Sequence, residues 1–215
     1  MTPGHITLLG DSIFDNAAYT RGGPDVLAHL GRMLPKPWSA SSHAEDGSRT
    51  THLAQQAAKV PPHATHVAVA IGGNDALANR DLLATAVSST AEALDLFAGR
   101  VENFEASYRA AIRSVTPLKR TAILCTIYNG WLDPAEARNA RVALMMFNDV
   151  ILRVAIEQSL AVIDLRLICT QPEDYVNAIE PSGAGGRKIA SAIAAALGVA
   201  DTPSAASHVY AGTSR

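Results

Sequence analysis

The fold is decided by one stretch near the start of the chain, HITLLGDS at residues 5–12. A short and partly β-branched run that is stopped by a glycine predicts a buried strand. Gly10 ends this strand, and the polar pair Asp11-Ser12 follows at its carboxyl end. In open parallel sheets, ligands bind beyond the carboxyl ends of the strands. The stretch therefore predicts the first strand of a sheet and, directly after it, part of a functional site.

The rest of the chain repeats the alternation of strand and helix, which indicates parallel βαβ units and a doubly wound sheet. Residues 1–200 are therefore predicted to form a single α/β domain, and the Ala/Ser/Thr/Gly-rich residues 201–215 a flexible C-terminal tail. Further strands are predicted over residues 38–42, 66–71, 121–126 and 161–165, and helices over 25–34, 50–59, 81–97, 101–116, 134–158 and 185–197.

Composition excludes several classes of protein. With 18 basic and 20 acidic residues the formal charge is −2, and no basic stripe indicates a nucleic-acid binder. No apolar run is long enough to span a bilayer, and the N-terminus lacks the pattern of a signal peptide. The two cysteines have neither disulfide-framework nor zinc-site spacing. We therefore expect a cytoplasmic protein without metal, cofactor, nucleic-acid partner or membrane contact, and its oligomeric state stays open.

Three short motifs follow predicted strands: Gly10-Asp11-Ser12, Gly47, and Gly72-Gly73-Asn74-Asp75. In this order and spacing they resemble the SGNH/GDSL hydrolase family, whose members hydrolyse esters and thioesters. The resemblance implies a flavodoxin-like three-layer α/β/α sandwich with a five-stranded parallel sheet in the order 2-1-3-4-5. It also implies that Ser12 is the nucleophile. The oxyanion hole would then consist of the Ser12 amide, the Gly47 amide and the Asn74 side chain.

Physical chemistry supports these roles and also offers plainer ones. A strand-to-helix junction holds a serine rigidly with its hydroxyl exposed, and a glycine at position 47 lets the backbone approach the reacting oxygen. Alternatively, Ser12 caps the segment that follows it, and residues 72–75 form an ordinary turn at a strand exit. The joint occurrence of the motifs at strand ends favours the catalytic interpretation.

The fourth motif departs from the family pattern. Where the family carries Asp-x-x-His before the last helix, this chain has Asn177 and Glu180, in a segment that resembles a bacterial branch with the sequence IEPS. A glutamate is an intrinsically weaker base than a histidine, but burial would raise its pKa. Glu180 would then act as the base, with Asn177 donating a hydrogen bond that orients it. The alternatives are that Glu180 only places a charge at a helix N-terminus, or that His43, near the end of the second strand, is the base.

Residues near the other strand ends complete the predicted site. Asp11, Asp75, Tyr128 and Asn129 are candidate substrate-binding residues, and Asp15, Asn16, Tyr19 and Trp131 are weaker candidates of the same kind. The sequence thus predicts a serine-dependent ester or thioester hydrolase, or an acyltransferase, with an altered acid–base pair. Its partner would be a small acyl or ester substrate. The alternative is a catalytically inactive protein of the same fold that binds a small ligand.

Overall fold

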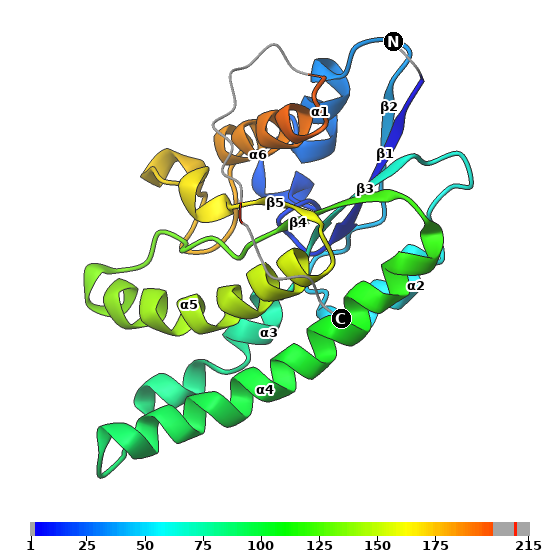
Figure 1. Ribbon diagram of the computed structural model, residues 1–215. Helices are drawn as coiled ribbons and strands as arrows, with labels where there is room; N and C mark the ends of the chain where they lie inside the picture. The colour runs from blue at the N-terminus through cyan, green and yellow to red at the C-terminus, as the bar shows by residue number, and fades with distance from the viewer. Residues whose placement is uncertain (1–2, 200–208, 210–215) are drawn as a thin grey trace.

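A computed structural model describes residues 3–199 and residue 209 (Figure 1). Five parallel strands form one sheet in the order β2-β1-β3-β4-β5, so the predicted fold and strand order are confirmed. The strands are β1 (His5–Gly10), β2 (Ser39–Ser42), β3 (His66–Ala70), β4 (Thr121–Cys125) and β5 (Ala161–Ile163). The helices are α1 (Val26–Met33), α2 (Leu53–Ala57), α3 (Gly73–Leu77), α4 (Thr90–Val115), α5 (Pro134–Glu157) and α6 (Gly183–Ala196).

The sheet lies between two layers of helices. Helices α1 and α6 cover one face, and α2, α4 and α5 cover the other (Figure 1). The alternation of side chains along β3 explains this arrangement, because Ala68 and Ala70 join the core with α1 and α6 while Val67 and Val69 join the opposite core. Both faces of the strand are thus buried, as the apolar run in the sequence predicts.

The region between β3 and β4 differs from the sequence-based expectation. Two helices were expected over 81–97 and 101–116, but a short 3-10 helix covers Arg80–Ala84 and a single 26-residue helix, α4, follows it. Helix α4 continues through Gly99, and it begins where the Ser89 hydroxyl accepts the Glu92 amide at 3.1 Å. The predicted tail over 201–215 lies outside the described residues except for Val209.

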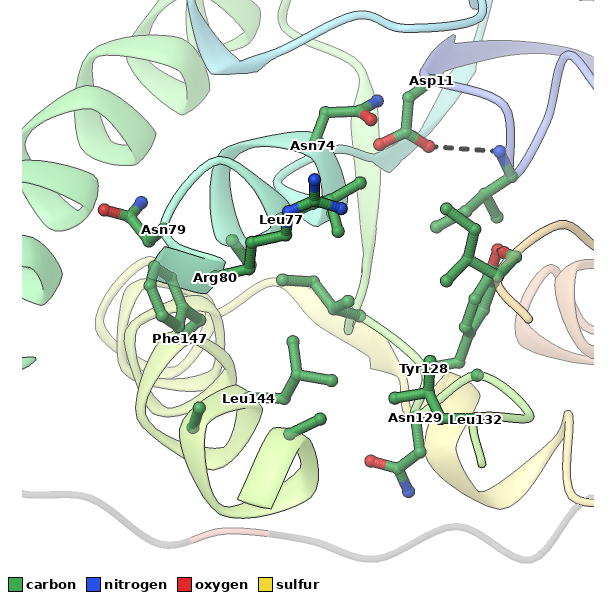
Figure 2. A pocket seen from close by; sticks show the side chains of 18 of the residues that line it. Asp11, Asn74, Leu77, Asn79, Arg80, Tyr128, Asn129, Leu132, Leu144 and Phe147 are labelled. Atoms are coloured by element: carbon green, nitrogen blue, oxygen red, sulfur yellow. Dashed lines mark hydrogen bonds between the residues drawn. The ribbon is translucent and has the colours of Figure 1, made fainter. Parts of the chain in front are cut away.

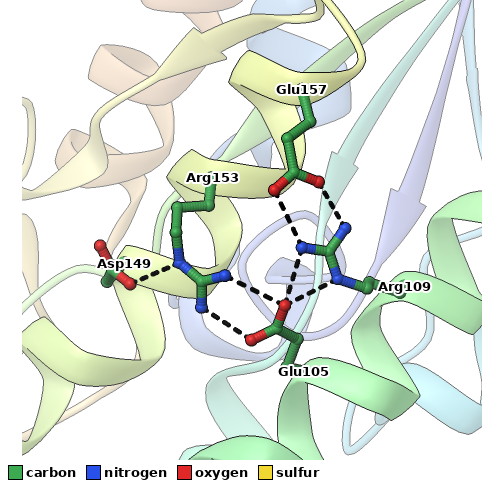
Figure 3. Close-up of polar contacts among 5 residues, drawn as sticks. All are labelled: Glu105, Arg109, Asp149, Arg153 and Glu157. Carbon is green, nitrogen blue, oxygen red and sulfur yellow. Dashed lines mark hydrogen bonds and ion pairs between the residues drawn. The ribbon is translucent and has the colours of Figure 1, made fainter. Parts of the chain in front are cut away.

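Helices α4 and α5 are joined by a network of ion pairs (Figure 3). Glu105 accepts from Arg109 at 2.7 Å and from Arg153 at 2.7 Å, and these arginines also bind Glu157 at 2.6 Å and Asp149 at 2.7 Å respectively. The two guanidinium groups hold the pKa of Glu105 down at about 2. The network joins α4 to α5, and both helices also contribute residues to the pocket described below.

None of the helices within residues 3–199 combines the length and the hydrophobicity that a membrane span requires.

Candidate active site

The carboxyl end of β1 is held in place by close backbone contacts. Gly10 has φ +142°, and a Cβ atom there would lie 1.8 Å from the Ala70 carbonyl oxygen of β3, so only glycine fits. The side chain of Gln56, which is 2% exposed, accepts the Gly10 amide at 2.7 Å and donates to the Gly10 carbonyl at 2.8 Å. Ser12, 8% exposed, follows two residues after Gly10, so the candidate nucleophile lies directly after a rigid element.

The candidate oxyanion donors come from two segments that are bonded to each other. Asn74 in α3 donates its side-chain amide to the Ser48 carbonyl at 3.0 Å, directly after Gly47. Asp75 accepts the amide of Thr50 at 3.0 Å and its hydroxyl at 2.7 Å. Both carboxylate oxygens of Asp75 therefore serve to fix the loop, and its predicted contact with substrate stays a prediction.

Residues 176–180 form a tight loop before α6, and it carries Glu180. The Asn177 side-chain oxygen accepts the amides of Ile179 at 2.9 Å and Glu180 at 2.8 Å, and the Val176 amide donates to the Glu180 carbonyl at 2.9 Å. The expectation that Asn177 donates to the Glu180 carboxylate is thus corrected. Asn177 orients Glu180 through the backbone, because its oxygen is the natural acceptor for amides two and three residues ahead.

The loop after β4 holds this segment from the other side. The Tyr128 hydroxyl donates to the Ile179 carbonyl, and the Trp131 amide donates to the Ala178 carbonyl at 2.8 Å. A Cβ atom on Gly130, which has φ +69°, would lie 2.6 Å from that same carbonyl oxygen. Tyr128 thus positions the loop that carries Glu180.

Glu180 faces the candidate nucleophile. Its side chain is partly buried, and Oε2 is buried without a hydrogen-bond partner among the described residues. Burial raises the pKa of this carboxyl group, and the charge of Asp46 raises it further, while hydrogen bonding with the Ser12 hydroxyl acts in the opposite direction. A carboxyl group that is more basic than a solvated glutamate thus lies in the same pocket as the candidate nucleophile.

Asp11, beside Ser12, is 1% exposed. Its Oδ1 accepts the Ile13 amide at 3.1 Å (dashed in Figure 2), and Oδ2 is buried and has no hydrogen-bond partner in the described structure. Burial raises the pKa of Asp11 to about 7, with smaller contributions from the charges of Glu180 and Asp75 and an opposing contribution from the Ile13 amide. A carboxyl group that titrates near neutrality thus adjoins the candidate nucleophile.

A deep pocket brings most of the predicted residues together (Figure 2). It has a cavity volume of about 160 Å³, and α5 forms one apolar wall through Ala140, Ala143, Leu144 and Phe147. Most of its other apolar residues come from α3, α4, the 3-10 helix and the β4 loop. The predicted residues that line it are Asp11, Ser12, Asn74, Tyr128, Asn129 and Glu180.

Other predicted residues lie elsewhere. Gly47 lines a second, polar pocket that shares Asn74 with the first, whereas Asp75, Asn177 and His43 line neither. His43 Nε2 is buried without a partner among the described residues, so nothing in the described structure connects it to Ser12. Asn16 is fully buried and bonds the Val26 amide at 2.9 Å and the Pro181 carbonyl at 3.3 Å. It joins α1 to the start of α6 and is not in the pocket.

Sequence reasoning missed two buried amides that shape the site. Gln56 holds Gly10, and Asn148 in α5 accepts the Ile127 amide at 2.8 Å and donates to the Ile127 carbonyl at 2.9 Å. The signal available for Asn148 is a polar residue among apolar ones on the core face of a helix. Within residues 3–199 and 209, no group of three or more His, Cys, Asp or Glu side chains is placed to hold a metal ion.

The chain is similar to known proteins in its sequence pattern and in its fold. Residues 8–188 match the GDSL-like Lipase/Acylhydrolase family. The structure resembles that of a lipase from a goat rumen metagenome, with a TM-score of 0.69 at 18% identity over 92% of this chain and 99% of that one. It also resembles an alpha/beta hydrolase enzyme from the metagenome of Lake Arreo, Spain, with a TM-score of 0.67 at 22% identity over 93% and 97%. An acetyl xylan esterase is also similar in structure, with a TM-score of 0.66 at 16% identity over 90% of this chain and 99% of that one. No curated protein sequence matches the chain significantly. The likenesses to solved structures show the shared fold.

Proposed function

Because the chain belongs to the GDSL-like lipase/acylhydrolase family, we propose that it hydrolyses small esters or thioesters with Ser12 as nucleophile and Glu180 as general base. One observation carries the proposal. Glu180, which the flanking sequence aligns with the family's histidine, lines the same pocket as Ser12, and its carboxyl group lies near enough to the Ser12 hydroxyl for that hydroxyl to affect its pKa.

The proposed reaction has two steps. The Ser12 oxygen attacks the carbonyl carbon while its proton passes to Glu180, and the resulting tetrahedral oxyanion is bound by the Ser12 amide, the Gly47 amide and Asn74. Collapse breaks the bond to the alcohol or thiol, which leaves with the proton from Glu180 and gives a Ser12 acyl ester. Water then attacks this ester, Glu180 accepts its proton and returns it to Ser12, and the acid departs. An alcohol in place of water would make the same site an acyltransferase.

A glutamate can replace the histidine here for two physical reasons. Its raised pKa brings the base closer to working pH, which improves proton transfer. Glutamate also becomes neutral when it accepts a proton, so no imidazolium cation needs a stabilising aspartate. Asn177 in place of that aspartate is consistent with this, because it binds the backbone amides of the loop and leaves the carboxyl group of Glu180 free to face Ser12.

The apolar part of the pocket that contains Ser12, called the apolar channel from here on, limits the size of the acyl group that we propose for the substrate. A cavity of about 160 Å³ is close to the size of an engineered cavity that accommodates benzene, at roughly 150 Å³. It therefore accommodates about six carbon atoms, which points to acyl groups from acetyl to hexanoyl. Asn129 lines this pocket (Figure 2) and is proposed to contact the substrate.

The test is hydrolysis of 4-nitrophenyl acetate and butyrate by the wild type, Ser12→Ala and Glu180→Gln. Both variants should lose at least about 10²-fold in kcat, the usual worth of a general base, and neither should have a lower unfolding midpoint than the wild type. Glu173→Gln, an exposed glutamate in the preceding turn, is the matched control and should retain full activity. Full activity in Glu180→Gln would exclude Glu180 as base. If the wild type hydrolyses these and other acyl esters no faster than Ser12→Ala does, the protein would instead be one that binds a ligand without catalysis.

A further inference from the structure

A polar pocket adjoins the catalytic pocket at the oxyanion donors. Gly47 and Asn74 form part of its lining, and Asn74, Leu77 and Arg80 line both pockets. The apolar channel leads from Ser12 between α3 and α5, whereas the polar pocket lies over the loop that carries Gly47. A carbonyl group bound in the oxyanion hole would thus have its acyl chain in the channel and its alcohol or thiol part near the polar pocket.

Three arginines line this polar pocket, and they differ in their partners. Arg100 is neutralised by Asp81 at 3.1 Å and also donates to Asn79 at 3.0 Å. Arg49 and Arg80 form no ion pair within the described part of the chain. Figure 2 shows the Arg80 side chain reaching back along α3 toward Asn74. Two uncompensated guanidinium groups therefore lie beside the oxyanion donors.

The acidic groups of the site are engaged elsewhere. Asp75 uses both oxygens to bind Thr50. Asp46 accepts the Tyr19 hydroxyl at 2.7 Å and influences Glu180, and Asp15 accepts the Asp46 amide at 2.9 Å. Among the residues that line the polar pocket, Asp81 is the one acidic side chain, and it is paired with Arg100, so Arg49 and Arg80 give the pocket a net positive charge. A planar guanidinium group recognises carboxylate and phosphate oxygens through paired hydrogen bonds.

We infer that the substrate is an ester or thioester whose alcohol or thiol part carries a carboxylate or phosphate, and that Arg49 and Arg80 bind this anionic group. The inference rests on the proposed function for the orientation of the substrate. It assigns the polar pocket to the leaving group and the apolar channel to the acyl chain.

The test compares two butyrate esters of similar shape, one of 4-hydroxybenzoate and one of its neutral amide, 4-hydroxybenzamide. Their kcat/KM values are each divided by the rate of hydroxide-catalysed hydrolysis, which removes the difference in leaving-group reactivity. The wild type should prefer the anionic ester by about tenfold, since two exposed ionic contacts contribute modestly. The preference should fall to about one in Arg49→Gln/Arg80→Gln, and it should shrink as salt rises. Arg187→Gln removes an exposed arginine from α6, on the opposite face of the sheet, and this variant should keep the preference for the anionic ester.

A binding measurement keeps this inference separate from catalysis. The Ser12→Ala protein is titrated with benzoate, phenyl phosphate and benzamide by calorimetry. Tighter binding of either anion, lost in the double arginine variant, would support the polar pocket even if no ester is turned over, and it would distinguish carboxylate from phosphate. Equal binding of anions and benzamide, or an anion preference that survives in Arg49→Gln/Arg80→Gln, would overturn the inference whether or not Ser12 is catalytic.

Discussion

Replacing Asp11 by asparagine should stabilise the protein in a strongly pH-dependent way. Asp11 is almost fully buried, and only one of its carboxyl oxygens has a partner, the Ile13 amide at 3.1 Å. Asparagine keeps that acceptor oxygen and cannot ionise. The variant therefore isolates the free-energy cost of a buried negative charge beside Glu180.

The sign and size of the effect follow from the pKa of Asp11, which rises from 3.8 to about 7 on folding. Between these two pH values the folded protein holds a proton on Asp11 that the unfolded chain releases. The contribution of Asp11 to the free energy of unfolding therefore falls as pH rises through this range and is constant above it. A difference of about 3 pH units at ~1.4 kcal/mol each amounts to ~4 kcal/mol. The free energy of unfolding of Asp11→Asn, relative to wild type, should thus increase by ~4 kcal/mol from below pH 4 to pH 8.

Urea unfolding of both proteins at several pH values between 4 and 8 measures this difference directly. Asp95→Asn, on the exposed side of α4, is the matched control for the loss of one negative charge. Parallel stability curves for wild type and Asp11→Asn across this range would refute the reasoning, because they would mean that Asp11 ionises as easily in the folded state as in the unfolded one.

Three further predictions address the supports of the site. Glu105→Gln should lower the free energy of unfolding at pH 7 by about 1–2 kcal/mol, since it breaks a partly exposed network. The pKa of Glu105 is lowered on folding from 4.5 to about 2. The loss of stability in Glu105→Gln, measured by urea unfolding, should therefore be complete above pH 4.5 and disappear toward pH 2. A loss of stability that does not change with pH would contradict this prediction. Gln56→Leu should lower Tm by about 5–10 °C in calorimetry, because it leaves the buried amide and carbonyl of Gly10 unpaired; an unchanged Tm would show that these bonds are dispensable. Leu144→Trp should narrow the apolar channel and reduce kcat/KM for 4-nitrophenyl hexanoate about tenfold relative to the acetate, and an unchanged ratio would place the acyl chain elsewhere.

The sequence predicts the sheet and the location of the site because both depend on local patterns. Apolar runs identify β1, β3, β4 and β5, whereas β2 (Ser39–Ser42) is mostly serine, and polar motifs at the carboxyl ends of the strands must meet at one edge of a parallel sheet. The division of 81–116 into two helices was wrong because Gly99 is tolerated within a helix: nothing lies within 4 Å of where its Cβ would be, and the helix continues through it. The alternative of a simple turn at residues 72–75 does not describe the structure either, since Gly73 begins the short helix α3.

The role of individual polar atoms could not be predicted from residue types. Asn177 was expected near Glu180 and is there, but an amide side chain can donate or accept, and only the backbone path of the loop shows that its oxygen accepts. The partners of Gln56 and Tyr128 lie 46 and 51 residues away in the chain, beyond any local pattern. The channel is equally invisible in the sequence, because its walls come from α3, α4 and α5 together.

The central claim is that Ser12 is an activated nucleophile although the usual histidine is absent. Intact-mass analysis after treatment with a fluorophosphonate, from pH 6 to pH 9, tests it most directly. We expect a single adduct on the wild type, no adduct on Ser12→Ala, and labelling slowed by at least about tenfold in Glu180→Gln. A folded wild-type protein without an adduct at any of these pH values, or an adduct that persists in Ser12→Ala, would contradict it.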